Sequence, residues 1–303
     1  MSPDATEPVC HLNGQYLPLA EARVPVLDRG FIFGDGVYEV VPVYAGAPFR
    51  WAQHRARLAR SLAKLRIDDP HDDAGWAALV GGLVARHPWP DQFVYLQVTR
   101  GAARRDHAFP AGVAPTVFAM SSELKAPAEA WRTQGIAAVS LPDERWLHCD
   151  IKSISLLGNV LARQAAADAG ALECLMFRDG MLTEGSASNV WVVRNGMVLG
   201  VPRDHLVLEG IRYGLLEELC AAAGVPFELR PVAREDVLAA DEILISSATK
   251  EVLPVTRLDG APVGSGAPGP VWAKLWDAYQ AAKARSIAAQ RAGSTAPAAA
   301  RAA

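Results

Sequence analysis

The segment 150–159, Asp-Ile-Lys-Ser-Ile-Ser-Leu-Leu-Gly-Asn, places a single lysine, Lys152, among apolar residues and just before a run with helical periodicity. Apolar neighbours partly remove an ammonium group from water, which favours the neutral amine. A neutral lysine amine is a nucleophile that forms Schiff bases with aldehydes. The alternative is an ordinary lysine at a helix start, with its aliphatic stem lying over apolar neighbours. Motifs elsewhere in the chain favour the first interpretation.

The length and composition indicate a globular protein with two domains. The chain has 303 residues, of which 50% are hydrophobic and 21% are charged, a balance typical of globular proteins. The net charge of -3 gives no electrostatic basis for binding nucleic acid. A small anionic ligand needs only a few local cations, so the net charge does not exclude one.

The four cysteines are scattered and form no C-x-x-C motif, so we expect reduced thiols and a cytoplasmic location. The segment 1–4 lacks the basic and then apolar pattern of a secretory signal. No apolar run approaches membrane-spanning length, so no membrane partner is expected. The seven histidines show none of the spacings typical of metal hydrolases, and we expect no metal site.

Local patterns predict an N-terminal α+β domain over residues 1–121. Alternation around Asn13-Gly14 predicts a hairpin over residues 10–17. A glycine-rich loop at 28–36 precedes an expected strand at 37–44, in which Pro42 indicates a bulge or an edge. Helical periodicity follows at 51–67 and 74–86. The expected strands at 92–99 and 116–121 are separated by a loop at 101–115.

The segment 122–130 is the expected linker to a second domain, residues 131–287, which makes the whole an α+β protein in two lobes. Hairpins are expected to turn at Asp179-Gly180 and Asn195-Gly196. Other expected elements are a strand at 135–140, a helix from the lysine segment to about residue 170, a helix at 209–223, a strand at 242–246 and a helix at 271–287. The alanine-rich residues 288–303 are expected to be a disordered tail.

Four sequence runs carry a resemblance to a known family: Phe33-Gly-Asp-Gly-Val-Tyr-Glu-Val-Val41, Gln97-Val-Thr-Arg-Gly101, Arg145-Trp-Leu-His-Cys-Asp-Ile-Lys-Ser153 and Leu182-Thr-Glu-Gly-Ser-Ala-Ser-Asn189. Over about residues 12–279 the chain resembles the class IV, fold-type-IV aminotransferases, which use pyridoxal 5′-phosphate. The resemblance implies a two-domain α+β fold with the cofactor between the domains. It also implies that the second domain is α/β-barrel-like and carries the cofactor lysine.

The resemblance assigns Lys152 as the Schiff-base lysine, which later moves a proton between the substrate and the cofactor. Glu184 matches the family's partner of the pyridine nitrogen. A carboxylate there keeps that nitrogen protonated, which lets the ring accept electron density when the α-proton leaves. Without the resemblance, Glu184 would be taken for a solvated glutamate in a turn.

The cofactor phosphate is assigned to several groups by the same resemblance. Arg57 matches the phosphate-binding arginine, and the frame His54-x-x-Arg57-Leu58 distinguishes it from the other arginines of its helix. The remaining phosphate contacts match Ile211, Arg212, Ser247 and Ala248, at a helix start and a turn where backbone amides suit a dianion. Arg212 and Ala248 stand where the family often has a threonine or another hydroxyl residue. Backbone donation survives both changes, whereas two hydroxyl contacts do not.

Tyr38 and the pair Arg105 and His107 match the residues that hold the α-carboxylate in the D-amino-acid aminotransferases of this family. A guanidinium, an imidazole and a phenol give a carboxylate both charge and directional donors. The members that act on branched-chain L-amino acids carry an arginine shortly after the Tyr-Glu pair, where this chain has Val40-Val-Pro-Val43. The amine transaminases and aminodeoxychorismate lyases lack the Arg-x-His pair.

We therefore expect an enzyme that uses pyridoxal 5′-phosphate to move the amino group of a D-amino acid such as D-alanine to a 2-oxo acid such as 2-oxoglutarate or pyruvate. The resemblance also implies a homodimer in which Arg105 and His107 reach the active site of the neighbouring subunit. The alternatives are an (R)-selective amine transaminase, a branched-chain L-aminotransferase or an aminodeoxychorismate lyase. A non-catalytic anion-binding protein with this fold is the alternative from a different class.

Overall fold

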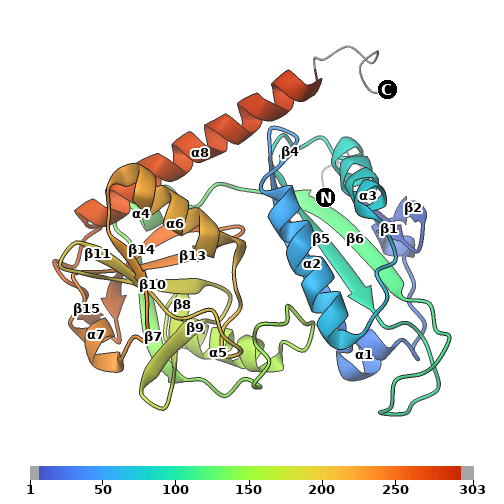
Figure 1. The fold of residues 1–303 in the computed structure, drawn as a ribbon, viewed down its shortest axis with the longest axis horizontal. Coiled ribbons are helices and arrows are strands. Elements are labelled where there is room, and N and C mark those ends of the chain that lie inside the picture. Colours follow the sequence, from blue (N-terminus) through green and yellow to red (C-terminus); the bar gives the residue numbers. More distant parts are fainter. Residues whose placement is uncertain (1–6, 295–303) are drawn as a thin grey trace.

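Two β-sheets divide the part of the chain that the computed structural model describes, residues 7–294, into two lobes (Figure 1). The elements of the first lobe are β1 (Val9–Leu12), β2 (Gln15–Pro18), a 3-10 helix (Leu19–Glu21), α1 (Arg29–Phe33), β3 (Gly36–Tyr44), β4 (Ala47–Pro48), α2 (Trp51–Leu65), α3 (Asp73–Ala85), β5 (Gln92–Thr99) and β6 (Thr116–Glu123). The expected strand–helix mixture is therefore present, and the α+β class is confirmed.

The second lobe contains most of the remaining chain. Its elements are α4 (Glu129–Thr133), β7 (Ile136–Pro142), α5 (Leu157–Asp168), β8 (Glu173–Arg178), β9 (Met181–Gly185), β10 (Asn189–Arg194), β11 (Met197–Gly200), α6 (Ile211–Ala223), β12 (Phe227–Leu229), α7 (Arg234–Leu238), β13 (Glu242–Ser247), β14 (Glu251–Leu258), β15 (Ala261–Pro262) and α8 (Pro270–Ser294).

The first sheet is antiparallel with the strand order β2-β1-β6-β5-β3-β4. Alternate residues of β3 and β5 pack against apolar residues of α2 and α3, and the buried Trp76 fills the centre of this core. The pairing of β3 with β5 has no register shift at Pro42. On its other side β3 pairs with the short strand β4 only at Val43 and Tyr44, so Pro42 lies on an edge of β3 that no strand covers. Of the two expected alternatives, the edge position is confirmed and the bulge is absent.

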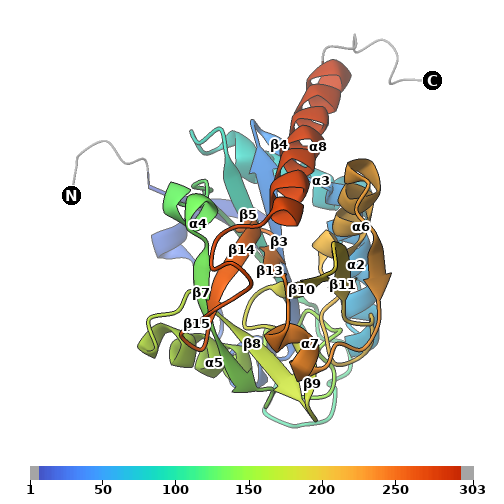
Figure 2. The ribbon, with the colours of Figure 1, turned by 90° about the vertical axis from the view of Figure 1, so that its left-hand side faces the viewer.

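The second sheet has nine strands and curls on itself. Its hydrogen-bonded order runs β12-β11-β10-β13-β14-β7-β8-β9, and Figure 2 shows β14, β7 and β8 next to one another. Four strands separate β9 from β10 in this order, yet only residues 186–188 connect them. In a flat sheet the gap would be about 24 Å, whereas four residue steps reach about 14 Å. The sheet must therefore bend strongly enough to bring β9 beside β10.

The lysine segment follows the second lobe's β7 in sequence but attaches to the first lobe. Ser153 forms an isolated antiparallel bridge with Val37 of β3. The Tyr38 amide donates to the Lys152 carbonyl at 2.9 Å, and the Ile154 amide donates to the Gly36 carbonyl at 3.0 Å. The neighbouring Ile151 is buried in the core of the first lobe. These contacts place Lys152 where the two lobes meet.

Two glycines allow this close approach. Gly34 has a φ of 66°, and a Cβ atom there would lie 2.7 Å from Ser155 Oγ. A Cβ atom at Gly36 would lie 2.6 Å from the carbonyl oxygen of Val98 and 3.1 Å from Ile154 Cδ1. Real Cβ contacts are longer than this. Gly34 is therefore required by the space that the lysine segment occupies, and Gly36 is required mainly by the backbone of β5 and also by Ile154.

Several boundaries differ from the sequence-based expectation. The last helix continues to Ser294, so residues 288–294 are helical and do not belong to a disordered tail; residues 295–303 lie outside the described residues. β6 continues to Glu123 and α4 begins at Glu129, so the connection is shorter than the linker expected at 122–130. The domain limits themselves remain a proposal.

The strand β14 was not among the expected elements, and it contains Pro254, a residue type that is rare in central strands. In the structure Pro254 pairs with Leu244 of β13, and the pairing of β14 with β7 begins only at Val255. The missing N–H of the proline therefore breaks no hydrogen bond to β7.

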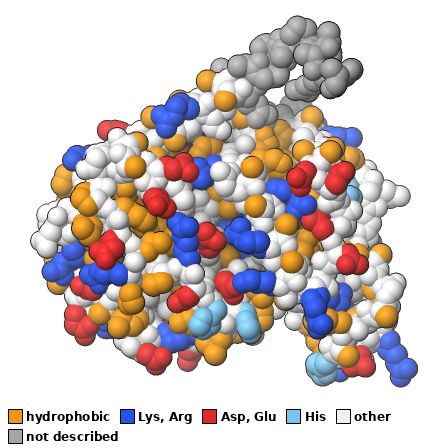
Figure 3. Space-filling model, viewed as in Figure 1, with side chains coloured by type: hydrophobic (Ala, Val, Ile, Leu, Met, Phe, Trp, Pro, Cys, Tyr) orange, Lys and Arg blue, Asp and Glu red, His pale blue; other side chains and the backbone are white. Residues whose placement is uncertain are grey.

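Two further observations concern the surface. Within residues 7–294 we find no helix with both the length and the hydropathy that a membrane crossing requires. On the face shown in Figure 3, basic and acidic side chains are interspersed, in keeping with the net charge of -3. This face offers no extended basic surface of the kind that binds nucleic acid.

We predict that Gly36→Ala destabilises the protein, because the new Cβ atom would clash with the Val98 carbonyl oxygen of β5 and with the Ile154 side chain of the lysine segment. The free energy of unfolding should fall by about 1–3 kcal/mol, measured by urea unfolding with circular dichroism. Gly81→Ala is the matched control, because Gly81 lies in α3 with nothing within 4 Å of its Cβ position. That variant should be as stable as the wild type or slightly more stable. Equal stability of Gly36→Ala and the wild type would contradict the tight packing of Gly36 against β5 and Ile154.

Candidate active site

A cavity of about 1130 Å³ lies between the two lobes. Side chains from β3 and α2 line it on one side, and residues of the second lobe line it on the other. The structure brings together eight of the ten residues predicted from the sequence: Tyr38, Arg57, Lys152, Glu184, Ile211, Arg212, Ser247 and Ala248. The two predicted residues outside the lining are Arg105 and His107.

The Lys152 backbone is fixed, whereas its side chain is available to the cavity. Its amide donates to Ser61 Oγ at 3.3 Å, and its carbonyl accepts from Tyr38. The ammonium nitrogen Nζ lies 4.1 Å from the centroid of the Tyr38 ring, a distance at which a cation is attracted to an aromatic face. No carboxylate of the described residues pairs with Nζ. The lysine is therefore held in position without being neutralised by an acid.

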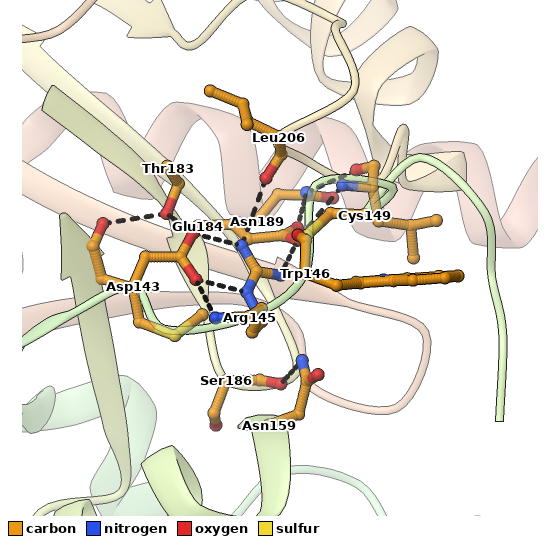
Figure 4. A network of polar contacts seen from close by, with 12 residues as sticks. Asp143, Arg145, Trp146, Cys149, Asn159, Thr183, Glu184, Ser186, Asn189 and Leu206 are labelled. Atoms are coloured by element: carbon orange, nitrogen blue, oxygen red, sulfur yellow. Dashed lines mark hydrogen bonds and ion pairs between the residues drawn. The ribbon is translucent and has the colours of Figure 1, made fainter. Parts of the chain in front are cut away.

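Glu184 lies on β9 in the second lobe's part of the lining, is buried, and accepts hydrogen bonds from three neighbours (Figure 4). Arg145 Nη1 donates to Oε1, the Leu208 amide donates to the same oxygen at 3.1 Å, and Asn189 Nδ2 donates to Oε2 at 3.2 Å. Burial raises the pKa of Glu184, and the Arg145 guanidinium only partly offsets this. The carboxyl group is therefore more basic than an exposed glutamate.

Arg145 is a site residue to which the sequence assigned no role. Figure 4 shows it between Asp143 and Glu184. Its Nε and Nη2 atoms each donate to Asp143 at 2.9 Å, and Thr183 Oγ1 donates to Asp143 at 2.8 Å. The position of Arg145, one residue after the acidic pair Asp143-Glu144, was the available signal. Its role became visible only when the fold brought β9 next to it.

Arg57 is held by a buried acid, Glu39, that the sequence analysis also left without a role. Arg57 Nε and Nη2 donate to Glu39 at 2.7 and 2.8 Å, and Nη1 donates to the Glu209 carbonyl at 3.1 Å. A guanidinium has five N–H donors, so two remain for a ligand in the cavity. A charged residue in the apolar strand 37–44 needs a partner, and that rule could have identified Glu39.

His54 completes this buried group. Its Nδ1 atom lies 2.7 Å from Glu39 Oε2. Burial lowers the pKa of His54 to about 4, although the bond to Glu39 acts in the opposite direction. The pKa of Glu39 is itself held well below its ordinary value: burial would raise it, and the Arg57 ion pair outweighs that effect. At neutral pH the group is therefore a carboxylate with a guanidinium and a neutral imidazole.

The first turn of α6 and the turn at 247–249 face the cavity together. The first amides of a helix have no acceptor within the helix, so those of Ile211 and Arg212 are available to an anion. The Arg212 side chain turns back instead, and its Nε and Nη2 atoms donate to the carbonyls of Ser247 and Ala248 at 3.2 Å each. The Arg212 guanidinium thus fixes the turn at 247–249 relative to the start of α6.

Glu173 holds the other loop of the lining, residues 185–188. The carboxylate is fully buried and accepts from the amide and hydroxyl of Ser186, from Ser188 Oγ at 2.8 Å and from Lys250 Nζ at 3.3 Å. Burial alone would raise its pKa, but Lys250 and the serine hydroxyls lower the pKa below its ordinary value. Sequence patterns gave no signal for this residue, because its side-chain partners come from two segments that are distant in the sequence, residues 186–188 and Lys250.

Arg105 and His107 are exposed on the 101–115 loop and lie beside Phe33, at the margin of the cavity. The Arg105 guanidinium carbon is 5.4 Å from the Phe33 ring centroid, and the His107 ring centroid is also 5.4 Å from it. Tyr38, by contrast, lines the cavity and packs against Tyr95. The three residues expected to hold a substrate carboxylate are thus not all within the lining formed by one chain.

The residues that line the cavity suit pyridoxal 5′-phosphate. They provide a lysine amine for the aldehyde, a buried carboxylate for the pyridine nitrogen, and a guanidinium with free helix amides for the phosphate. The buried thiol of Cys149 also lies in the lining, and burial raises its pKa to about 11. Within residues 7–294, no group of three or more His, Cys, Asp or Glu side chains is arranged to hold a metal ion.

Comparisons with known proteins identify the class. The sequence model of the family described as Amino-transferase class IV matches residues 36–258, and the chain belongs to this family. The resemblance is confirmed. The D-alanine aminotransferase of Bacillus licheniformis is 41% identical over 268 residues, which cover 88% of this chain and 94% of the relative. That of Staphylococcus aureus (strain MSSA476) is 35% identical over 270 residues, with 89% and 95% covered.

Solved structures share the fold. The branched-chain amino acid aminotransferase of Escherichia coli matches with a TM-score of 0.86 at 22% identity and covers 91% of this chain and 94% of that chain. A second branched-chain amino acid aminotransferase, solved with pyridoxamine 5′-phosphate, matches with a TM-score of 0.84 at 24% identity, with 91% and 93% covered. That of the archaeon Thermoproteus uzoniensis, solved with norvaline, has a TM-score of 0.81 at 23% identity, with 90% and 93% covered. At these identities the likeness shows the fold alone, and it confirms the predicted fold class.

We predict that His54→Asn makes stability less dependent on pH between about 4 and 6.5. In the wild type the folded pKa of His54 lies below the unfolded value of about 6.5. The unfolded state therefore binds more protons in this range, and the free energy of unfolding falls as pH drops from 6.5 towards 4, by about 1–3 kcal/mol. Asparagine keeps a donor to Glu39 and does not titrate.

The measurement is urea unfolding at a series of pH values for both proteins. His71→Asn is the control, because this histidine lies on the connection between α2 and α3, outside the cavity lining. Parallel pH profiles for wild type and His54→Asn would contradict the assignment of the titration to His54.

Proposed function

We propose that this chain is a D-amino-acid aminotransferase that uses pyridoxal 5′-phosphate, with D-alanine as amino donor and 2-oxoglutarate or pyruvate as acceptor. The observation that carries the proposal is the placement of Lys152 and Glu184 in the lining of one cavity between the lobes. Membership of the class IV aminotransferases implies the cofactor. The D-alanine aminotransferases with 41% and 35% identity support the D-amino acid as substrate.

The cavity residues have distinct tasks in this proposal. When bound, the cofactor supplies an aldehyde and an electron-accepting ring. Lys152 Nζ would carry the proton between the substrate Cα and C4′ of the cofactor, and the ring of Tyr38 limits where that amine can lie. Glu184 would keep the ring nitrogen protonated, and its raised pKa makes it a suitable partner for a pyridine.

The phosphate would be held by Arg57 and by the amides of Ile211 and Arg212. The ion pair with Glu39 orients Arg57 before any ligand arrives, which lowers the entropy cost of binding. The Ser247 hydroxyl accepts from the Lys250 amide at 3.1 Å, so its own proton remains free to donate. Ala248 contributes only its backbone.

The choice of a D-amino acid over a branched-chain L-amino acid rests on the residues after Tyr38. The positions at which the branched-chain members carry an arginine are here Val40 to Val43, and Val41 and Val43 are fully buried in the first core. None of these four side chains is charged, so this segment provides no cation for a carboxylate. In this proposal Arg105 and His107 supply the donors instead, and the Arg105 guanidinium supplies the positive charge.

We further propose a cytoplasmic homodimer in which the 101–115 loop of one subunit completes the cavity of the other. Arg105 and His107 are exposed and outside the lining of their own cavity. Large apolar side chains are exposed near α1 and along α5, among them Phe31, Leu157 and Leu161. A second subunit would cover such surface.

A substrate panel tests the reaction. Wild-type protein should transfer the amino group of D-alanine to 2-oxoglutarate, and L-amino acids and simple (R)-amines should react much more slowly. Lys152→Ala should lose at least about 10³-fold in turnover, on the scale expected for loss of a proton-transferring group. Borohydride should attach the cofactor covalently to the peptide containing residues 150–159 in the wild type only.

Lys274→Ala is the control, because Lys274 is exposed on α8 away from the cavity lining. It should keep full activity and the same labelled peptide. Labelling of a different lysine would contradict the site. A preference for (R)-amines or L-amino acids would identify the enzyme as another member of the family.

Mixed dimers test the sharing of sites. Arg105→Ala with His107→Ala should lower kcat/KM for D-alanine by about 30- to 1,000-fold, as expected for a lost charge-assisted contact. Subunits carrying this double change are mixed with Lys152→Ala subunits. Shared sites predict that each mixed dimer regains one intact site and therefore activity. No recovery after verified subunit exchange would show that each site is contained in one chain.

A further inference from the structure

The 101–115 loop, which carries Arg105 and His107, is attached at its start to the segment before and within α1. The Arg29 amide donates to the Gly101 carbonyl at 2.9 Å, and the Ala103 amide donates to the Leu27 carbonyl at 3.2 Å. Asp28 and Ala102 form an isolated antiparallel bridge. The loop is therefore anchored where it leaves β5, although it has no strand or helix of its own.

The centre of the loop is held by one buried side chain, Arg29. Its Nη1 atom donates to the carbonyls of Asp106 and Ala108 at 2.5 and 3.4 Å, and its Nη2 atom donates to the His107 carbonyl at 3.3 Å. Three consecutive carbonyls thus converge on a single guanidinium, whose planar fork of donors suits several acceptors at once. Because only backbone groups are used, the side chains of Arg105 and His107 remain exposed and available.

Asp35 fixes Arg29 in turn. Its carboxylate accepts from Arg29 Nε at 2.7 Å and from Arg100 Nε and Nη2 at 2.8 and 3.0 Å. Burial would raise the pKa of Asp35, but the two arginines lower it below its ordinary value. The acid therefore stays ionised at neutral pH and shares its charge between the two guanidinium groups.

Arg100 extends the same network to the far part of the loop. It donates to the carbonyls of Leu65 and Arg66 at 2.8 and 3.1 Å. Its guanidinium carbon lies 3.6 Å from the ring centroid of Phe109, and that of Arg66 lies 4.7 Å from the same centroid. Phe109 is thus held by two cations although nearly half of its surface is exposed.

Burial costs the Arg29 guanidinium its hydration, and the ion pair with Asp35 and the loop carbonyls offset that cost. Arg29 is only 3% exposed and is not part of the cavity lining, so it does not act on a ligand there. We propose that Arg29, held by Asp35, is a positioning residue that fixes the 105–107 backbone and thereby presents Arg105 and His107 to the carboxylate of the substrate. This inference rests on the proposed function, since it assumes a substrate carboxylate.

A loop that is ordered before binding adds little entropy cost when the substrate arrives. The D-amino acid and the 2-oxo acid both carry the carboxylate, so both depend on the loop. The cofactor is bound by Lys152, Glu184 and Arg57, which this network does not touch. Loosening the loop should therefore weaken substrate binding and leave cofactor binding unchanged.

Arg29→Lys tests the proposal, because lysine keeps the charge near Asp35 but lacks the fork that reaches three carbonyls. With the holoenzyme, KM for both D-alanine and 2-oxoglutarate should rise about 10- to 100-fold, the scale of a misplaced binding group. Turnover at saturation and the affinity of the apoenzyme for pyridoxal 5′-phosphate should stay close to wild type. Amide hydrogen exchange, followed by mass spectrometry, should accelerate in peptides covering residues 102–112.

Arg55→Lys is the matched control. Arg55 is mostly buried and is paired with Asp69 and Asp73 at 2.7 and 2.9 Å, away from the loop. The Arg55→Lys variant should therefore leave both KM values unchanged. If Arg29→Lys does not fold, Phe109→Ala tests the same proposal at an exposed position, where a substitution is less disruptive to the fold. Removing the ring that contacts Arg66 and Arg100 should raise both KM values, by a smaller factor than Arg29→Lys.

The possible results are distinguishable. Unchanged KM values with faster exchange of the loop would overturn the positioning role, and so would a parallel loss of cofactor affinity. A wild-type enzyme that does not accept D-alanine would contradict the proposed function and this inference with it. A wild type that accepts D-alanine while Arg29→Lys and Phe109→Ala keep their KM values would contradict this inference alone.

Discussion

The pairing of residues 151–154 with β3 is the contact on which both the cavity and the position of Lys152 depend. The chain leaves the second sheet at the end of β7, crosses to the edge of the first sheet, and returns to the second lobe in α5. Ile151 is buried in the core of the first lobe. The lysine therefore lies at the junction of the two lobes: its segment packs on the first lobe, and the chain on either side of it belongs to the second.

The charges around the cavity come as fixed pairs. Glu39 holds Arg57, Arg145 holds Glu184, and Lys250 pairs with Glu173. Such buried pairs add little to stability on average, because desolvation offsets most of the attraction. Their value here is orientation: each group that faces a ligand is already aimed, so little reorganisation is needed when charge develops in the reaction.

The sequence was informative where the signal is local. The turns at Asn13 and Asn195 adopt the positive φ that Asn-Gly turns require, and both hairpins were predicted. The strand β14 was missed, and its Pro254 is tolerated there because β7 begins to pair only at Val255. The role of Arg145 could not be predicted, since Asp143 and Glu184 come together only through the fold. Arg105 and His107 were identified by resemblance, but they lie outside the cavity lining of their own chain.

The edge of β3 that receives the lysine segment also has a consequence for biosynthesis. The ribosome finishes β6, the last strand of the first sheet, at Glu123, and reaches the lysine segment only at Ile151. At the usual speed of translation this interval lasts about 1–6 s. A first lobe that folds as it emerges therefore carries, for that time, an uncovered strand edge with free amides and carbonyls, a surface that readily pairs with another strand. The order of the sequence thus makes the nascent first lobe more prone to aggregation than the finished protein.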